Sequence, residues 1–139
     1  MHDDIFLHCL GKISGVGAEK LRKIAAYFET FESAWNAPSE EFLRAGIPEK
    51  LAETIAHARK NIDPEREQDA LEQHHIRLVP MGNADYPALL AEIPNPPQLL
   101  YLRGNIHPNS RPAITIVGTR KPTEYGVGIA QEFASELAK

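Results

Sequence analysis

One polar segment of the sequence combines the residue types that bind anions. It runs from Gly118 to Gly126, between a run of β-branched residues and a helix-forming stretch. Arg120 has a guanidinium that can donate two parallel hydrogen bonds, and Thr119 adds a hydroxyl and a backbone amide. Such donors suit the oxygen atoms of a phosphodiester. We therefore predict a nucleic-acid-binding turn made of Gly118, Thr119, Arg120, Lys121, Tyr125 and Gly126, in which Tyr125 either stacks on a base or packs at the start of the helix.

The turn does not match the common nucleotide-binding motifs. The pattern G-x-G-x-x-G cannot be fitted from Gly118, and no Gly-Lys-Ser or Gly-Lys-Thr follows. The dinucleotide fingerprint and the P-loop are therefore both excluded. The alternative to a binding site is a solvated basic loop in which Arg120 pairs with Glu124.

A second glycine-containing segment, Ile13–Leu21, resembles the hairpin of a helix-hairpin-helix element. Gly15 and Gly17 permit a tight turn, and the amides at the start of the following helix favour a phosphate. Lys20 adds positive charge, whereas Glu19 places a negative charge beside it. Gly15, Gly17 and Lys20 are therefore a secondary candidate for DNA binding. The alternative is an ordinary glycine link between two packed helices.

Residues for catalysis and metal binding follow no familiar pattern. His74 and His75 are adjacent, so on a helix they point about 100° apart and cannot share a metal ion. No serine lies in a nucleophile-elbow context. Cys9 is the single cysteine, and we expect it to be a small buried residue. The sequence thus predicts no catalytic residue, no metal and no cofactor.

The elements that position these residues change in type near residue 75. Before that point apolar residues recur at helical spacing, and breakers at Gly15–Gly17, Pro38–Ser39, Gly46–Pro48 and Asp63–Pro64 divide the stretch into short helices. We predict a small helical domain over residues 1–75. Its expected core consists of Leu10, Ile13, Leu21, Ile24, Tyr27, Phe28, Phe31, Trp35, Phe42, Leu43, Leu51 and Ile55.

From residue 76 onward the pattern is that of strands and a helix. Ile76–Pro80 and Gln98–Arg103 are expected strands, joined by a turn-rich and proline-rich connection. Ala113–Gly118 is typical of a strand buried on both faces, and Tyr125–Ala138 of an amphipathic helix. These two form the first half of a βαβ unit whose return strand is absent. We therefore expect residues 76–139 to begin an α/β domain and the sequence to be a fragment.

Charge and hydropathy restrict the class of protein further. The formal net charge is −4, so bulk positive charge cannot drive binding to nucleic acid, and any such contact must be local. No apolar run is long enough for a membrane span, and the N-terminus lacks the basic start of a secretory signal. A cytoplasmic protein is expected.

Three motifs occur in order behind the helical stretch. They are Tyr86-Pro87-x-x-Leu90, then Pro96-Pro97-x-x-Leu100-Tyr101-x-Arg103-Gly104, and finally Ile116-Val117-Gly118-Thr119-Arg120 with Tyr125-Gly126. Together with the Ile13–Gly17 segment, this order resembles the signature of the DprA/Smf family. The resemblance covers essentially the whole chain and is strongest from Tyr86 onward.

The resemblance implies a fold and a function. The fold is a sterile-alpha-motif-like helical domain followed by the start of an extended Rossmann-like, doubly wound domain. The function is that of a recombination mediator that binds and protects single-stranded DNA and helps to load RecA in natural transformation, without catalysis. The family's Gly-Ser-Arg turn maps to Gly118, Thr119 and Arg120, with threonine in place of the commoner serine. A homodimer is implied through a part of the protein beyond Lys139.

Two alternative functions belong to other classes of protein. The same nucleotide-binding superfamily includes phosphoribohydrolases of the LOG type, which need acidic catalytic groups further along the fold. The second alternative is that the helical domain is chiefly a protein-interaction module. Release of free base from nucleotides would indicate the first, and a protein partner for residues 1–75 would indicate the second.

Overall fold

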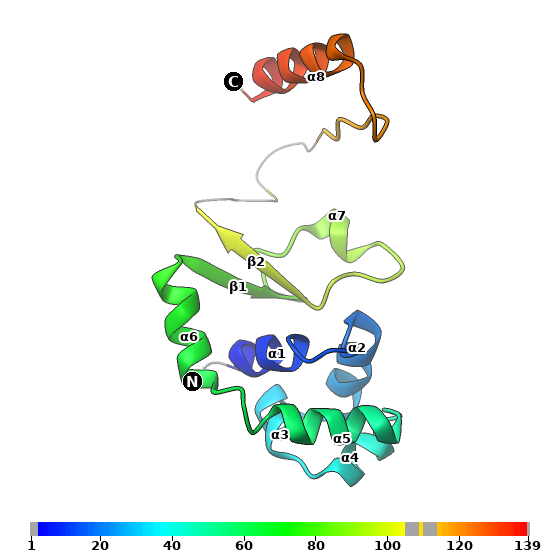
Figure 1. The fold of residues 1–139 in the computed structure, drawn as a ribbon, viewed down its shortest axis with the longest axis vertical. Helices are drawn as coiled ribbons and strands as arrows, with labels where there is room; N and C mark the ends of the chain where they lie inside the picture. The colour runs from blue at the N-terminus through cyan, green and yellow to red at the C-terminus, as the bar shows by residue number, and fades with distance from the viewer. Residues whose placement is uncertain (1–2, 105–108, 110–113, 139) are drawn as a thin grey trace.

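The computed structural model describes residues 3–104, 109 and 114–138. In chain order the elements are α1 (Asp3–Gly11), α2 (Ala18–Tyr27), α3 (Phe31–Asn36), α4 (Ser39–Arg44), α5 (Glu49–Ala58), α6 (Pro64–Gln73), β1 (Ile76–Pro80), α7 (Ala88–Ala91), β2 (Leu99–Arg103) and α8 (Glu124–Leu137). Figure 1 shows α1 to α5 gathered in a bundle, with α6 leading to the β1–β2 sheet beside α1. None of the described helices has both the length and the apolar character that a membrane span requires.

The breaks between the helices lie where the sequence predicts them. Gly15, with φ of 90°, lies between α1 and α2, and Gly46, with φ of 76°, lies between α4 and α5. The Asp63 side chain accepts a hydrogen bond from the second amide after it, and Pro64 occupies the first turn of α6. These are the N-cap and the first-turn proline that favour a helix start, so this prediction is confirmed.

The short helix α3 is held at both ends by side chains from distant positions. The Asp3 carboxylate accepts hydrogen bonds from two amides in the first turn of α3, at 3.1 and 2.8 Å. At the other end, the Arg59 guanidinium donates to the carbonyl oxygens of Trp35 and Ala37. A helix of six residues is too short to be stable by itself, so these contacts fix it in the bundle.

The core of the bundle surrounds Phe42, which is fully buried. The predicted core residues that are buried or packed against the core are Leu10, Ile13, Leu21, Ile24, Phe28, Phe31, Trp35, Phe42, Leu51 and Ile55. The prediction is wrong for Tyr27 and Leu43, which are each 42% exposed. Leu43 follows Phe42 on the helix and so points about 100° away from the core. The Tyr27 hydroxyl donates instead to the Glu41 carboxylate at the surface, at 2.6 Å.

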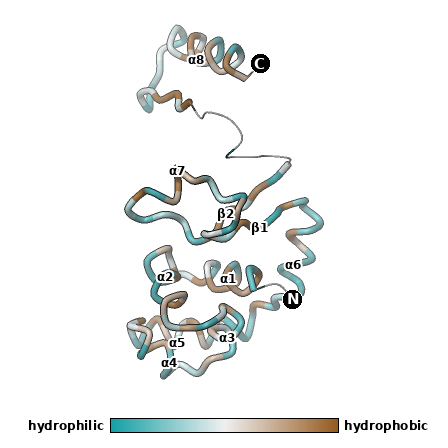
Figure 2. The backbone as a smooth tube through the Cα atoms, turned by 180° about the vertical axis from the view of Figure 1, so that it is seen from behind, coloured by the Kyte–Doolittle hydropathy of each residue, from teal (hydrophilic) through white to brown (hydrophobic). Residues whose placement is uncertain are grey.

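The two predicted strands β1 and β2 are confirmed, and they form an antiparallel pair. Val79 lies opposite Leu100 and is fully buried, and Leu78 and Leu99 pack against the core of the helical bundle. Figure 2 shows hydrophobic residues along both α1 and β2. The apolar core of the helices therefore continues to the face of the sheet.

The prediction of a strand at Ala113–Gly118 is wrong for residues 114–118, which form no strand. Ala113 lies outside the described residues. The side chains of Ile114, Ile116 and Val117 are 67, 46 and 86% exposed. A β-branched run becomes a strand only where a second main chain supplies the ladder hydrogen bonds. Among the described residues no strand lies beside this segment. The amphipathic helix that follows is confirmed as α8.

A polar network joins the helices to the sheet. Glu67 on α6 accepts hydrogen bonds from Lys12, at 2.5 Å, and from Nε2 of His8 on α1, at 3.1 Å. Nδ1 of the same His8 lies 2.8 Å from the hydroxyl of Tyr101 on β2. The bond from Lys12 is the main reason that the pKa of Glu67 is lowered, and His8 lowers it further.

We expect this network to make stability depend on acid pH. A carboxyl group whose pKa is lowered by folding stabilises the folded state above the pKa of the unfolded chain, and this contribution is lost as the pH falls through the folded value. The free energy of unfolding of the wild type should therefore decrease below about pH 4.5 more steeply than that of Glu67→Gln. Urea unfolding at about pH 7 and about pH 3.5 measures the difference. The exposed Glu65→Gln is the control, and an equal pH dependence in both variants would contradict the expectation.

Candidate nucleic-acid interface

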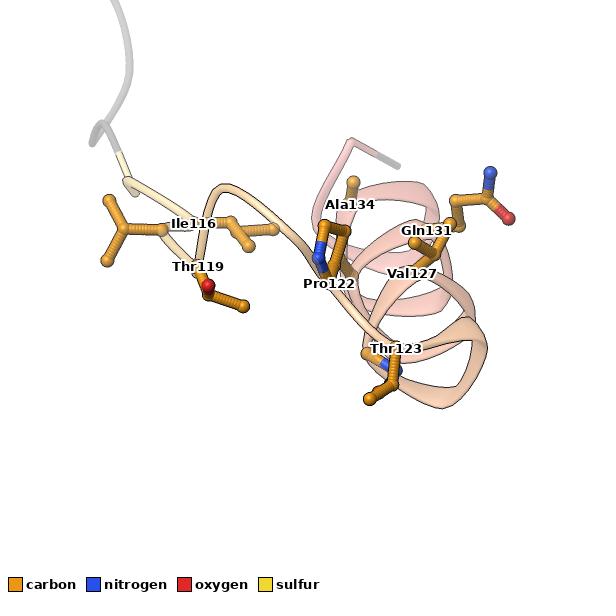
Figure 3. A pocket seen from close by; sticks show the side chains of 11 residues that line it. Ile116, Thr119, Pro122, Thr123, Val127, Gln131 and Ala134 are labelled. Carbon is orange, nitrogen blue, oxygen red and sulfur yellow. The ribbon is translucent and has the colours of Figure 1, made fainter.

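A groove of about 670 Å³ lies between the extended segment 116–119 and α8. Figure 3 shows Ile116 and Thr119 on one side, and Val127 and Ala134 of α8 on the other. The wall is mostly apolar and contains no carboxylate side chain. The groove therefore suits a flat or apolar group better than a cation.

Thr123 organises the start of α8. It is the N-cap residue, and its Oγ1 accepts a hydrogen bond from the Gly126 amide at 3.2 Å. A Cβ at position 126 would lie 3.4 Å from that oxygen, an ordinary contact distance, so the cap does not require glycine there. One amide of the first turn is thus already satisfied and does not remain for a phosphate. This role of Thr123 is not among the predictions from the sequence, although a threonine directly before a helical stretch is an N-cap signal.

Arg120 and Lys121 are exposed in the loop before α8. The alternative pair between Arg120 and Glu124 is not among the ion pairs of the described residues. Thr119 Oγ1 accepts from the Lys121 amide at 3.4 Å and so turns the chain beside the arginine. Tyr125 is 79% exposed, and it therefore does not pack at the helix start. The basic groups and the ring are open to a ligand from solvent.

The structure brings together part of the predicted turn. Three residues of the predicted turn line the groove, namely Gly118, Thr119 and Gly126. The residues that lie outside its wall are Arg120, Lys121 and Tyr125. The two cationic residues are thus neighbours in sequence of residues that line the groove, but they do not form its wall.

The secondary candidate has a clear role in packing. A Cβ at Gly15 would lie 3.1 Å from Leu51 Cδ1, so this glycine lets the loop after α1 approach α5 closely. Gly17 is the N-cap residue of α2 and provides no side-chain cap. Lys20 donates a hydrogen bond to Glu19 at 3.0 Å, and this bond is the main cause of the lowered pKa of Glu19. Because the lysine is paired with a carboxylate, the geometry favours the packing alternative.

Cys9 is fully buried on α1. Burial is the main cause that raises the pKa of its thiol to about 12, so the reactive thiolate is scarce at neutral pH. Cys9 is therefore a core residue, as the sequence predicts. In residues 3–104 and 114–138, together with Asn109, no three His, Cys, Asp or Glu side chains lie together as a metal site would require.

Asn109 fixes the turn before α7, a contact that the sequence analysis missed. Its Oδ1 accepts from the Ala88 amide at 2.9 Å, and its Nδ2 donates to the carbonyls of Ala84 and Tyr86 at 3.3 and 2.9 Å. These groups lie more than 20 positions away in the sequence. No local pattern signals such a contact.

Comparison with known proteins relates these features to a family. The family model described as DNA recombination-mediator protein A matches residues 77–139. Protein Smf of Synechocystis sp. is 35% identical over 133 residues, which cover 92% of this chain and 33% of that protein. The DNA processing protein DprA of Bacillus subtilis is 32% identical over 71 residues, which cover 50% of this chain and 24% of that protein. No solved structure matches the chain.

The matched family is described as a DNA recombination mediator and the Bacillus relative as a DNA processing protein, and this is the class of proteins to which the chain is related. The chain belongs to the DprA/Smf family, as its three motifs predict. It spans about a third of the length of the Synechocystis relative and about a quarter of the Bacillus relative.

We expect Thr123→Ala to loosen the start of α8. Without Oγ1 the Gly126 amide loses its acceptor, and loss of an N-cap typically costs about 1 kcal/mol. Amide hydrogen exchange at positions 126 and 127, followed by NMR, should become roughly fivefold faster. Ser135→Ala in the same helix is the control, because it removes a hydroxyl without touching the cap. Equal exchange in the two variants would contradict this role of Thr123.

Proposed function

We propose that the chain is part of a protein that binds single-stranded DNA and mediates recombination. Membership of the DprA/Smf family supports a role in DNA processing. The observation that carries the proposal is the exposed Arg120, unpaired with Glu124 and next in sequence to residues that line a groove of about 670 Å³. Its guanidinium fork holds one phosphate, while Gly118 and Thr119 shape the adjoining pocket.

Tyr125 supports a preference for single strands. Its ring is 79% exposed in the first turn of α8, where a base can stack on it. Stacking on an aromatic ring accepts any base, but it requires that the base be free of its partner strand. Lys121 adds a second positive charge close to the same position in the sequence. Together these groups suit a strand whose bases and backbone are both accessible.

The activity of the whole protein is proposed from the family resemblance. It comprises protection of incoming DNA, loading of RecA in natural transformation, dimerisation through a part beyond Lys139, and a cytoplasmic location. We assign residues 1–75 to a sterile-alpha-motif-like domain and residues 76–139 to the start of a Rossmann-like domain. In such a domain the segment 114–118 pairs with neighbouring strands and helices cover the faces of the sheet, which accounts for the apolar character of Ile114.

The charge of the helical half supports a second role, in protein interaction. Residues 1–75 contain 14 Asp and Glu and nine Lys and Arg, a formal charge of −5. Residues 76–139 contain five acidic and six basic residues, a formal charge of +1. Negative charge repels a phosphate backbone, so the helical half is better suited to a protein partner than to DNA.

We expect Arg120→Ala to weaken binding of single-stranded oligonucleotides by the complete gene product. The logarithm of the binding constant falls linearly with the logarithm of the salt concentration, and loss of one phosphate contact should reduce the size of this slope by about 0.7. This corresponds to about fivefold weaker binding near 0.1 M salt. Fluorescence anisotropy over a salt series measures both quantities. Arg22→Ala, an exposed arginine on α2, is the matched control. The assignment fails if the two variants lose affinity equally or if the salt slope of Arg120→Ala is that of the wild type.

The alternative function is a phosphoribohydrolase of the LOG type, whose acidic catalytic groups are expected further along the fold. We expect the complete gene product to release no free base from nucleoside monophosphates, as measured by chromatography. Base release that persists after repeated purification would replace the proposed function with a hydrolase.

A further inference from the structure

Four side chains meet at the junction of the helical bundle and the sheet. His8 lies on α1 and Lys12 just after it, Glu67 lies on α6, and Tyr101 lies on β2. His8 is only 7% exposed, yet both of its ring nitrogens have a partner. The rings of His8 and Tyr101 also pack edge to face, with centroids 5.5 Å apart. This cluster lies apart from the groove beside α8 and has no part in the proposed function.

The chemistry of the partners fixes the direction of each hydrogen bond. Glu67 is ionised at neutral pH because its pKa is lowered, and an ionised carboxylate only accepts hydrogen bonds. Nε2 of His8 therefore carries a proton and donates to Glu67. In the neutral ring Nδ1 is then an acceptor, and the Tyr101 hydroxyl donates to it. The result is a continuous chain of bonds from β2 through α1 to α6.

This chain of a hydroxyl, an imidazole and a carboxylate has the connectivity of an activated nucleophile. The tyrosine, however, is held in its protonated form. Burial is the main cause that raises the pKa of Tyr101, and the negative charge of Glu67 raises it further. A phenol that keeps its proton is a poor nucleophile and remains able to donate a hydrogen bond. The arrangement therefore fits a structural link better than a reactive group.

The link connects elements that are distant in the sequence. Tyr101 and His8 are 93 positions apart, and His8 and Glu67 are 59 positions apart. The apolar contacts of Leu78 and Leu99 with the helical core surround the same junction. The bond is partly buried, because Tyr101 is half exposed whereas His8 is buried. Loss of the tyrosine hydroxyl would leave Nδ1 of His8 without its hydrogen bond, which is costly on a buried ring. The contact thus joins the second half of α1 to the middle of β2.

We propose that the Tyr101–His8–Glu67 chain is a conformational clamp that makes α1, α6 and the β1–β2 sheet open and close as one unit. The segments that leave this unit include the loop after α1 and the chain after β2, which continues in sequence to the candidate turn at Arg120. The clamp gives both segments a fixed starting point. A ligand that stabilises the sheet stabilises the helical bundle as well.

Tyr101→Phe in the full chain tests the clamp, because it removes the hydroxyl and keeps the ring against His8. Amide hydrogen exchange should become roughly three- to tenfold faster in α1, in α6 and in β2 together, while α4 and α5 change less. Tyr86→Phe is the matched control. Its hydroxyl donates to the Pro97 carbonyl at 2.7 Å, so its effect should be confined to the connection between β1 and β2.

Two results would overturn the clamp. Faster exchange in β2 alone would mean that the strand opens without the helices. A uniform increase across all elements, as large in α4 and α5 as in α1, would mean that the bond contributes only to global stability. Neither result depends on DNA, so this test can fail while the proposed function holds, and the reverse.

Discussion

Main-chain groups that leave water need hydrogen-bond partners, and in this protein several of those partners are side chains from distant parts of the sequence. Asp3 supplies acceptors to the first turn of α3, Arg59 donates to carbonyls at its end, and Asn109 serves the turn before α7. The helices concerned are too short to hold themselves. The fold therefore depends on these polar contacts as well as on the apolar packing around Phe42.

The same requirement separates the parts of the fold that the sequence predicts from those that it does not. Helix breaks depend on local residues such as Gly46 and Pro64, and these predictions are confirmed. A strand forms only beside a neighbouring strand, so a β-branched run does not by itself decide whether residues 114–118 form one. These residues are exposed, and they belong to no sheet of the described structure. The prediction of burial is wrong at Leu43 for a similar reason. Leu43 is apolar, but it follows Phe42 on a six-residue helix and so lies on a different face.

The candidate site is likewise predictable in composition and less so in geometry. The types and order of Gly118, Thr119 and Arg120 indicate an anion-binding turn and the family. Which of them lines the groove and which faces solvent depends on how the loop folds before α8. The cap from Thr123 follows a local rule and was open to prediction. The contact of His8 with Tyr101 joins residues 93 positions apart, and neither residue carries a pattern that points to the other.

The state of Cys9 bears on how the protein can be studied. It is the single cysteine of the sequence, it is fully buried, and its thiol has a pKa of about 12. Maleimide and spin-label reagents react with accessible thiolates, so Cys9 in the folded chain should react with them only very slowly. A cysteine introduced at an exposed position can then be labelled selectively with Cys9 left in place. Fluorescent and paramagnetic probes become usable without disturbing the first helix.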